Sequence, residues 1–277
     1  MKKYIYIGGY GRSGSTILDL FISSSGLFSI GEFICIEDNY NSGKLCTCGD
    51  RIEECDIWKS LVLRRNKSFY KSWFSSLFKE WDVNSKLDYS IVDSSKTSYN
   101  AAWRPFYISY IARNKFKFSY IHVFRSPFIM VRSVFSGSNK LLEKGIDHKR
   151  IGLLQSIKTI INYYISFLAG SLIKLFNKDE TIFLDFDEFL EDEESRNRLV
   201  SYLDLKKIPE LKGGFKINKK YSEHMIDGNR LRFKDEIIFK IPSTPKFKSL
   251  SLIEAFTAIS IYPAWKLSKI MSNNAFK

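Results

Sequence analysis

A glycine-rich loop near the N-terminus constrains this chain most. The apolar residues 4–7 are followed by GYGRSGST at 9–16, which predicts a strand that ends in a loop and continues into a helix. Glycines let backbone N–H groups approach a ligand closely, and a helix N-terminus favours negative charge. We therefore expect an anionic group to bind at Gly11, Arg12, Ser13, Gly14, Ser15 and Thr16.

The loop differs from the phosphate-binding signature of nucleotide triphosphatases at one important position. That signature, GxxxxGK[ST], has a lysine after its second glycine that reaches the β- and γ-phosphates. Gly9 and Gly14 keep the spacing, but Ser15 occupies the lysine position, and Arg12 supplies a cation from within the loop. The pattern favours a nucleotide whose terminal group is not a γ-phosphate.

Two further motifs place cations where predicted strands end. In HVFRSPFIMVRSVFS a strand ends at Arg125, and the helix after the proline carries Ser133. In IVDSSKT a strand ends at Asp93, and Lys96 lies in the following turn. An arginine can meet two phosphate oxygens at once, and a helical hydroxyl adds a hydrogen bond without adding charge.

The order of the predicted elements indicates an α/β fold. Strands are expected at 4–7, 90–92, 119–124 and 181–184, with helix-like stretches between them. This alternation predicts a parallel sheet flanked by helices, as in P-loop nucleotide triphosphatases, with ligands beyond the carboxyl ends of the strands. Because no internal repeat or linker is evident, residues 1–277 are expected to form one domain.

With these motifs the chain resembles the sulfotransferase family over residues 4 to about 233. In that family a similar loop holds the 5′-phosphosulfate of 3′-phosphoadenosine 5′-phosphosulfate (PAPS). Residues that match Arg125 and Ser133 hold its 3′-phosphate, although the family more often reads RDPR where this chain has RSPF. The resemblance implies the sulfotransferase fold, PAPS as donor and adenosine 3′,5′-bisphosphate as product.

The resemblance also implies catalytic roles. In related tyrosine-sulfating enzymes, a lysine at a place comparable to Lys96 contacts the transferring sulfuryl group. Arg12 and Lys96 would stabilise the negative charge that develops on the leaving phosphate. Glu32 matches the glutamate base of glycan- and tyrosine-sulfating members, while Glu37 or Asp38 is the alternative base. None of the three histidines matches the base of cytosolic small-molecule sulfotransferases.

A C-terminal segment extends the resemblance. YSEHMIDGNRLRF is similar to an element of bacterial sulfotransferases, HxxxGNxxRF, with matches at His224, Gly228, Asn229, Arg232 and Phe233. By analogy it would fold over the nucleotide, with Gly228, Asn229 and Arg232 in the binding site.

Three of the four cysteines, Cys46, Cys48 and Cys55, lie in the segment CTCGDRIEECDIWK, and Cys35 lies upstream of it. A closed zinc site needs four Cys or His ligands, and this CxC pair with a lone cysteine provides an incomplete set. Similar CxCG…CxxW inserts occur in bacterial sulfotransferases. The insert is expected to be stapled by a disulfide or packed around Trp58, and no metal is expected.

The net charge of the chain indicates that its partners are negatively charged. The formal charge of +13 predicts a positive field that attracts nucleotides, acidic glycans, nucleic acids or anionic membranes. The absence of a recognition-helix or RNA-sheet motif speaks against nucleic acid, and peripheral membrane contact fits the charge. The first apolar run breaks before it could form an export signal, and residues 151–176 read as too polar to span a bilayer. The expected location is the cytoplasm.

The sequence therefore predicts sulfuryl transfer from PAPS to an acceptor hydroxyl on a saccharide. Residues 60–90 and 137–180 are expected to shape the acceptor pocket, but they contain no motif that identifies the acceptor. One alternative is a nucleotide or small-molecule kinase with the same phosphate loop. The other is a basic protein that binds anions or nucleic acid without catalysis.

Overall fold

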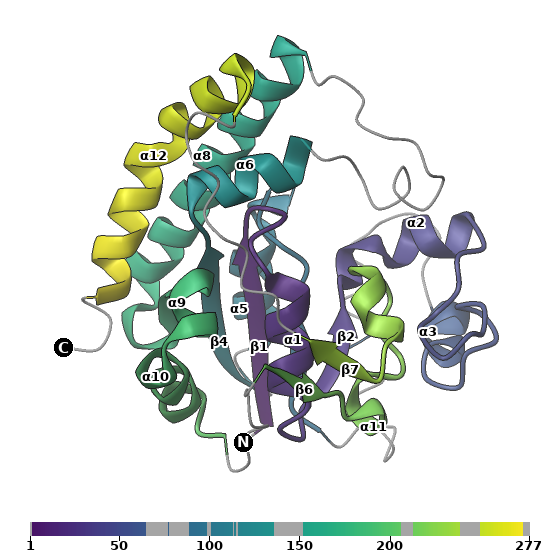
Figure 1. Cartoon of the computed structure of the whole chain (residues 1–277). Helices are drawn as coiled ribbons and strands as arrows, with labels where there is room; N and C mark the ends of the chain where they lie inside the picture. Colours follow the sequence, from purple (N-terminus) through teal and green to yellow (C-terminus); the bar gives the residue numbers. More distant parts are fainter. Residues whose placement is uncertain are drawn as a thin grey trace.

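A five-stranded parallel sheet lies at the centre of the computed structural model (Figure 1), in the order β2-β3-β1-β4-β5. Its strands are β1 (Lys2–Gly9), β2 (Phe28–Gly31), β3 (Ile91–Asp93), β4 (Phe116–Phe124) and β5 (Thr181–Asp185). A separate antiparallel pair consists of β6 (Gly214–Lys216) and β7 (Glu236–Ile238). The structure describes residues 2–64, 77, 89–98, 101–112, 114, 116–135, 152–205, 213–238 and 250–273.

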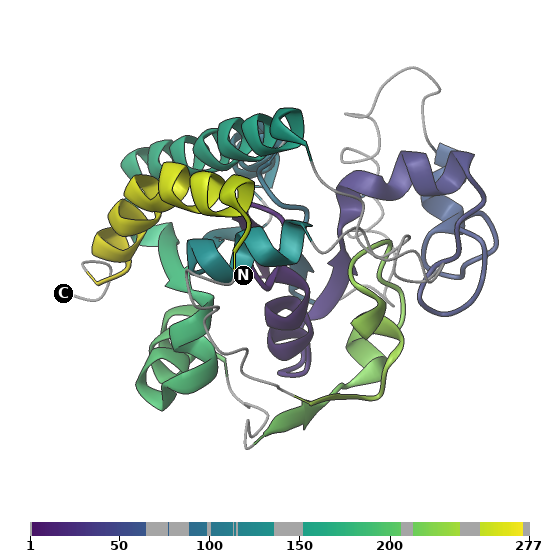
Figure 2. The same ribbon diagram turned by 45° about the horizontal axis from the view of Figure 1, so that its top comes forward.

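Helices cover both faces of the sheet (Figures 1 and 2). The α-helices are α1 (Ser15–Ser23), α2 (Ile36–Asn41), α3 (Lys59–Arg64), α5 (Arg104–Ala112), α6 (Pro127–Phe135), α8 (Leu153–Phe176), α9 (Phe186–Glu191), α10 (Glu193–Leu203), α11 (Lys219–Ser222) and α12 (Leu252–Asn273). Short 3-10 helices are η1 (Phe33–Cys35), η4 (Lys178–Glu180) and η5 (Arg230–Phe233).

The side chains of β1 point alternately to the two faces of the sheet and belong to two separate parts of the core. Tyr4 and Tyr6 are buried in a cluster with residues of α5 and α8, whereas Ile5 and Ile7 are buried in a cluster with residues of α1, α9 and α10. Successive side chains of a strand point to opposite faces, and a parallel sheet covered on both sides is apolar on both. This arrangement fixes β1 in the middle of the sheet, so that its carboxyl end delivers the glycine-rich loop between β3 and β4.

The long helix α8 corrects one prediction. By length and composition alone Leu153–Phe176 could cross a membrane, because an 18-residue window of this helix has a mean hydropathy of 1.3. The expectation that residues 151–176 are too polar was therefore wrong. In the fold, α8 lies beside α12 (Figure 2). Ser156 and Thr257 share a hydroxyl hydrogen bond of 2.6 Å, and Lys174 donates to the Met271 carbonyl. The membrane contact stays a prediction.

The predicted fold class is confirmed, with local differences. All four expected strands are present, although β1 and β4 begin earlier than expected. The sequence analysis missed β2, which has only four residues and contains Ser29 and Gly31. This omission matters because Glu32 directly follows β2. The assignment of residues 1–277 to one domain stays a prediction.

Candidate functional site

A cavity of about 700 Å³ opens beyond the carboxyl ends of the parallel strands, where α/β sheets bind their ligands. Most of the predicted site residues line it, whereas Gly11 and Ser13 lie in the same loop but outside the lining. The lining residues are Arg12, Gly14, Ser15, Thr16, Ile17, Glu32, Lys44, Leu45, Lys96, Arg125, Ser133, Phe186, Asp227, Gly228, Asn229, Leu231, Arg232 and Phe233.

Two glycines of the loop are required by its geometry. Gly9 has a φ of 116°, and a Cβ there would lie 2.1 Å from the Val123 carbonyl oxygen. Gly14 has a φ of 96°, and a Cβ there would lie 2.5 Å from the Phe186 ring. A side chain at either position would combine a steric clash with an unfavourable backbone conformation. Gly14 directly precedes α1, so the free N–H groups of the first helical turn face the cavity.

Arg12 and Lys96 share an unusual backbone conformation. Their φ values are 72° and 56°, in the left-handed region that residues other than glycine seldom adopt. Such strain persists only where the surrounding structure enforces it, and it concentrates at functional sites. Both side chains line the cavity, so the strained backbone presents two cations to the same space.

A buried network holds the Lys96 turn against the glycine-rich loop. The Asp93 carboxylate, at the end of β3, accepts hydrogen bonds from the Tyr4 hydroxyl at 2.8 Å and the Ser95 N–H at 3.0 Å. The Lys96 carbonyl accepts from the Tyr6 hydroxyl at 2.6 Å, and the Gly9 N–H donates to the Thr97 hydroxyl at 2.9 Å. The turn and the loop are therefore positioned as one unit.

Glu32 and Lys96 form the central ion pair of the cavity. Lys96 Nζ donates to Glu32 Oε1 at 2.6 Å, and the two side chains are 27% and 12% exposed. Burial alone would lower the pKa of Lys96, but the Glu32 carboxylate outweighs this effect and the pKa is raised. Lys96 therefore stays a cation beside a carboxylate, which places the predicted base next to a predicted sulfuryl-binding residue.

Arg125 is oriented by a carboxylate that the sequence analysis did not identify. Its Nε donates to Asp187 Oδ1 at 2.7 Å, while the Ser126 N–H donates to Asp187 Oδ2 at 2.9 Å. The guanidinium also lies 5.4 Å from the centre of the Phe186 ring. These contacts use Nε and one face of the guanidinium, and Arg125 lines the cavity. Ser133, on α6, lines the same cavity.

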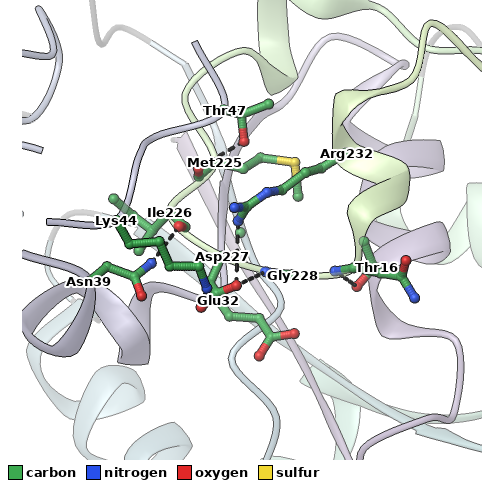
Figure 3. Close-up of polar contacts among 12 residues, drawn as sticks. Thr16, Glu32, Asn39, Lys44, Thr47, Met225, Ile226, Asp227, Gly228 and Arg232 are labelled. Atoms are coloured by element: carbon green, nitrogen blue, oxygen red, sulfur yellow. Dashed lines mark hydrogen bonds and ion pairs between the residues drawn. The ribbon is translucent and has the colours of Figure 1, made fainter. Parts of the chain in front are cut away.

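The loop of residues 224–233, here called the C-terminal loop, lines one side of the cavity, and Figure 3 shows several of its polar contacts. The Asn229 N–H donates to the Thr16 hydroxyl at 3.3 Å, which joins this loop to the first turn of α1. Asp227 pairs with Lys44 at 2.6 Å and with Arg232 at 3.5 Å. Burial alone would raise the pKa of Asp227, but these cations and the Gly228 N–H outweigh it and the pKa is lowered. The lowered pKa makes the Asp227 carboxylate a weak proton acceptor.

Arg232 is a buried cation at the cavity wall. Only 3% of the residue is exposed, and burial lowers the pKa of its guanidinium despite the nearby Asp227. Its Nη1 atom makes the ion pair of 3.5 Å with Asp227, while Nε makes no hydrogen bond with any described residue. The Arg232 charge is therefore balanced mainly by Asp227, at the wall of the cavity.

The other titratable candidates lie elsewhere. Glu37 and Asp38, the alternative bases, belong to α2 and do not line the cavity. His122 is buried within β4, where burial lowers its pKa to about 3. His148 lies outside the described residues. His224 does not line the cavity and instead contacts Cys55.

The structure adds residues that the sequence analysis missed. Lys44, Asp227 and Phe186 line the cavity, and Asp187 holds Arg125. Asp187 could have been found, because it follows a predicted strand that lies beside the strand ending at Arg125. Lys44 and Asp227 are 183 positions apart in the sequence, and no local signal pairs them. The four cysteines are free in this structure, so of the two alternatives for the insert it shows packing around the buried Trp58 and no disulfide.

The buried carboxyl group of Asp19 should make the free energy of unfolding depend on pH. This side chain of α1 is fully buried and accepts a hydrogen bond of 2.6 Å from Ser94, but burial raises its pKa to about 7. The folded protein therefore holds this proton more tightly than the unfolded chain between about pH 4 and pH 7. The free energy of unfolding should consequently fall as the pH rises through this range.

We expect Asp19→Asn to weaken that fall and to make the protein more stable than the wild type above about pH 7, by up to about 4 kcal/mol. Urea unfolding of both proteins across this range measures the effect. Some decline should remain, because burial also raises the pKa of Asp93. Identical slopes for the two proteins would show that Asp19 does not retain its proton.

Comparison with known proteins finds solved structures with a similar fold. No protein-family model and no curated protein matches the chain. A sulfotransferase domain from the curacin biosynthetic pathway is similar, with a TM-score of 0.51 and 16% identity over 95% of this chain and 97% of that one. The sulfotransferase domain of the Synechococcus PCC 7002 olefin synthase has a TM-score of 0.42 and 15% identity, over 98% and 95% of the two chains. At these identities the likeness concerns architecture, and the chain has the fold of a sulfotransferase domain.

Proposed function

We propose that this protein is a sulfotransferase that moves the sulfuryl group of PAPS to a hydroxyl of a saccharide acceptor. The observation that carries the proposal is the convergence of two separate anion-binding elements on one cavity. The glycine-rich loop with Lys96 forms one element, and Arg125 with Ser133 forms the other. PAPS carries anionic groups on both its 5′ and 3′ sides, whereas ATP carries them on one side only.

Each element suits one end of the donor. The backbone of residues 11–16 and the N-terminus of α1 would bind the 5′-phosphosulfate. Arg125, oriented by Asp187, would bind the 3′-phosphate with its terminal amino groups, and the Ser133 hydroxyl would add a hydrogen bond. Gly228, Asn229 and Arg232 would cover the nucleotide from the C-terminal loop.

The proposed reaction is an in-line displacement at sulfur. The acceptor oxygen attacks the sulfur atom, the bond from sulfur to the bridging phosphate oxygen breaks, and adenosine 3′,5′-bisphosphate leaves. The acceptor proton passes to the Glu32 carboxylate. Arg12 and Lys96 stabilise the negative charge that develops on the bridging oxygen.

The Glu32–Lys96 pair would couple these two events. Before the reaction, the carboxylate neutralises part of the Lys96 charge across 2.6 Å. When Glu32 accepts the acceptor proton it becomes neutral, and the Lys96 charge becomes fully available to the leaving phosphate. Electrostatic stabilisation is thereby greatest when the leaving-group charge is greatest, which lowers the barrier rather than only the energy of the bound substrate.

We propose a saccharide because the reaction needs an acceptor hydroxyl and a base that takes its proton, and sugars are rich in hydroxyl groups. The segments expected to shape the acceptor pocket, 60–90 and 137–180, lie partly outside the described residues. Among the described residues, Lys44 and Leu45 line the same cavity as Glu32, and the Lys44 charge is paired with Asp227 at 2.6 Å.

A transfer assay with two labelled donors tests the proposal. The protein is incubated with extracted glycans and either PAPS labelled in its sulfate or ATP labelled in its γ-phosphate, with and without Mg²⁺. We expect sulfate to enter the glycan fraction, with adenosine 3′,5′-bisphosphate released in equal amount, and no need for Mg²⁺. Transfer of phosphate that requires Mg²⁺ would identify a kinase instead. Binding of PAPS without release of adenosine 3′,5′-bisphosphate would indicate a non-catalytic protein.

A further inference from the structure

Three thiols and one imidazole converge outside the cavity. Cys46, Cys48, Cys55 and His224 each place one ligand atom in a group whose members all lie within 4.8 Å of one another. In the sequence only the three cysteines lie close together. The fourth member, His224, follows Cys55 by 169 positions and lies in the C-terminal loop.

Three distances from Cys55 are close to the edges of a zinc tetrahedron. Zinc lies about 2.3 Å from thiolate sulfur and about 2.0 Å from imidazole nitrogen, so tetrahedral ligands are about 3.8 Å apart for two sulfurs and about 3.5 Å apart for sulfur and nitrogen. Here Cys55 Sγ lies 3.7 Å from Cys48 Sγ, 3.9 Å from Cys46 Sγ and 3.3 Å from His224 Nδ1. A disulfide would need two sulfurs about 2.05 Å apart, and all four cysteines are free.

We propose that Cys46, Cys48, Cys55 and His224 bind one Zn²⁺ ion in a closed structural site. Three cysteines and one histidine form a complete ligand set for structural zinc, and thiolate ligands select zinc over Mg²⁺ or Ca²⁺. The set leaves no open position for a substrate. None of the four residues lines the cavity, so the metal takes no part in the transfer reaction proposed above.

The surrounding contacts hold the ligands in place. The Cys46 N–H donates to the Asp50 carbonyl at 2.8 Å, and the Gly49 N–H donates to the Cys46 carbonyl at 3.0 Å, which closes a tight loop around the CxC pair. Trp58 Nε1 donates to the His224 carbonyl at 2.9 Å. The His224 ring also stacks on Phe28, with an interplanar angle of 15°. The imidazole is therefore oriented with Nδ1 toward Cys55.

The metal would connect the cysteine insert to the loop that covers the nucleotide. Next to His224, the Met225 carbonyl accepts from the Thr47 hydroxyl at 2.9 Å, and the Ile226 carbonyl accepts from Asn39 at 2.7 Å (Figure 3). Farther along the same loop, Asp227 pairs with Lys44. A zinc ion at the start of this series would fix the loop that carries Gly228, Asn229 and Arg232.

Metal analysis of the full-length protein tests the proposal independently of any transferase activity. After purification and dialysis, mass spectrometry of the metals should find one zinc per chain. Cobalt substitution should give the visible absorption of a tetrahedral site with thiolate ligands. Cys48→Ser and His224→Ala should each lose most of the zinc. Cys35→Ser is the matched control, because Cys35 is a free thiol outside the cluster, and it should retain the metal.

His224→Cys separates loss of a ligand from loss of structure. A fourth thiolate can complete the tetrahedron, so this variant should bind zinc where His224→Ala does not. If the variants that lack zinc unfold, the zinc content of the wild-type protein still tests the proposal. Titration with a mercurial reagent should release its zinc as the three cluster thiols react. Wild-type protein without zinc, zinc retained in His224→Ala, or a disulfide between any two of the three cluster cysteines would overturn the proposal.

Discussion

Replacing Glu32 with glutamine is expected to lower turnover by about two to four orders of magnitude while nucleotide binding is retained. Glutamine has nearly the same shape but cannot accept the acceptor proton. The substitution also removes the ion pair of 2.6 Å with Lys96. The Lys96 cation then loses the partner whose charge is proposed to change during the reaction. Steady-state rates with saturating donor, combined with calorimetric titration of adenosine 3′,5′-bisphosphate, separate the two effects.

Glu37→Gln is the matched control for this prediction. Glu37 lies five positions after Glu32, on α2, and does not line the cavity. Its substitution should leave turnover within a factor of about two. The assignment of the base is contradicted if Glu32→Gln turns over like the wild type, or if Glu37→Gln shows the large loss instead.

Arg125→Ala is expected to abolish the preference of the protein for adenosine 3′,5′-bisphosphate over AMP. These nucleotides differ only in the 3′-phosphate. Two hydrogen bonds from a guanidinium to a phosphate contribute at least about 3 kcal/mol, which is about a 100-fold change in the dissociation constant. Affinity for AMP should hardly change, because its 5′-phosphate binds at residues 11–16. Calorimetric titration of both nucleotides into both proteins gives the difference.

Two further variants sharpen this result. Arg125→Lys keeps the charge but loses the paired donors and the stacking on Phe186, so it should restore only part of the preference. Arg132→Ala removes an exposed arginine on α6, seven positions after Arg125 and outside the cavity lining, and should bind like the wild type. A preference that persists in Arg125→Ala would move the 3′-phosphate to another cation.

The fold could be predicted from the sequence because its main signals are local. Residues 4–7 and 119–124 are apolar runs of the length expected for strands, and both occupy the middle of the sheet. The two glycines of the loop have positive φ values that other residues avoid, so their spacing reports backbone geometry directly. The short strand β2 lacks such a signal, because its pairing with β3 rather than its composition makes it a strand.

The site residues that could be predicted from the sequence are those that directly follow the predicted strands. Arg12, Lys96 and Arg125 follow β1, β3 and β4, and neighbouring parallel strands bring their carboxyl ends together. The missing parts depend on contacts between distant segments. Asp227 meets Lys44, and His224 meets Cys55, across more than half of the chain. No periodicity or spacing in the sequence records such contacts, which form only when the C-terminal loop docks beside β2.

The most direct test of the central claim is a titration of the wild-type protein with adenosine 3′,5′-bisphosphate and with AMP, without Mg²⁺. The claim is that one cavity holds an adenosine nucleotide by phosphates at both its 5′ and its 3′ positions. We predict that the bisphosphate binds about 100-fold more tightly than AMP. Equal affinities would contradict the account, because the 3′-phosphate would then make no contact with Arg125 and Ser133.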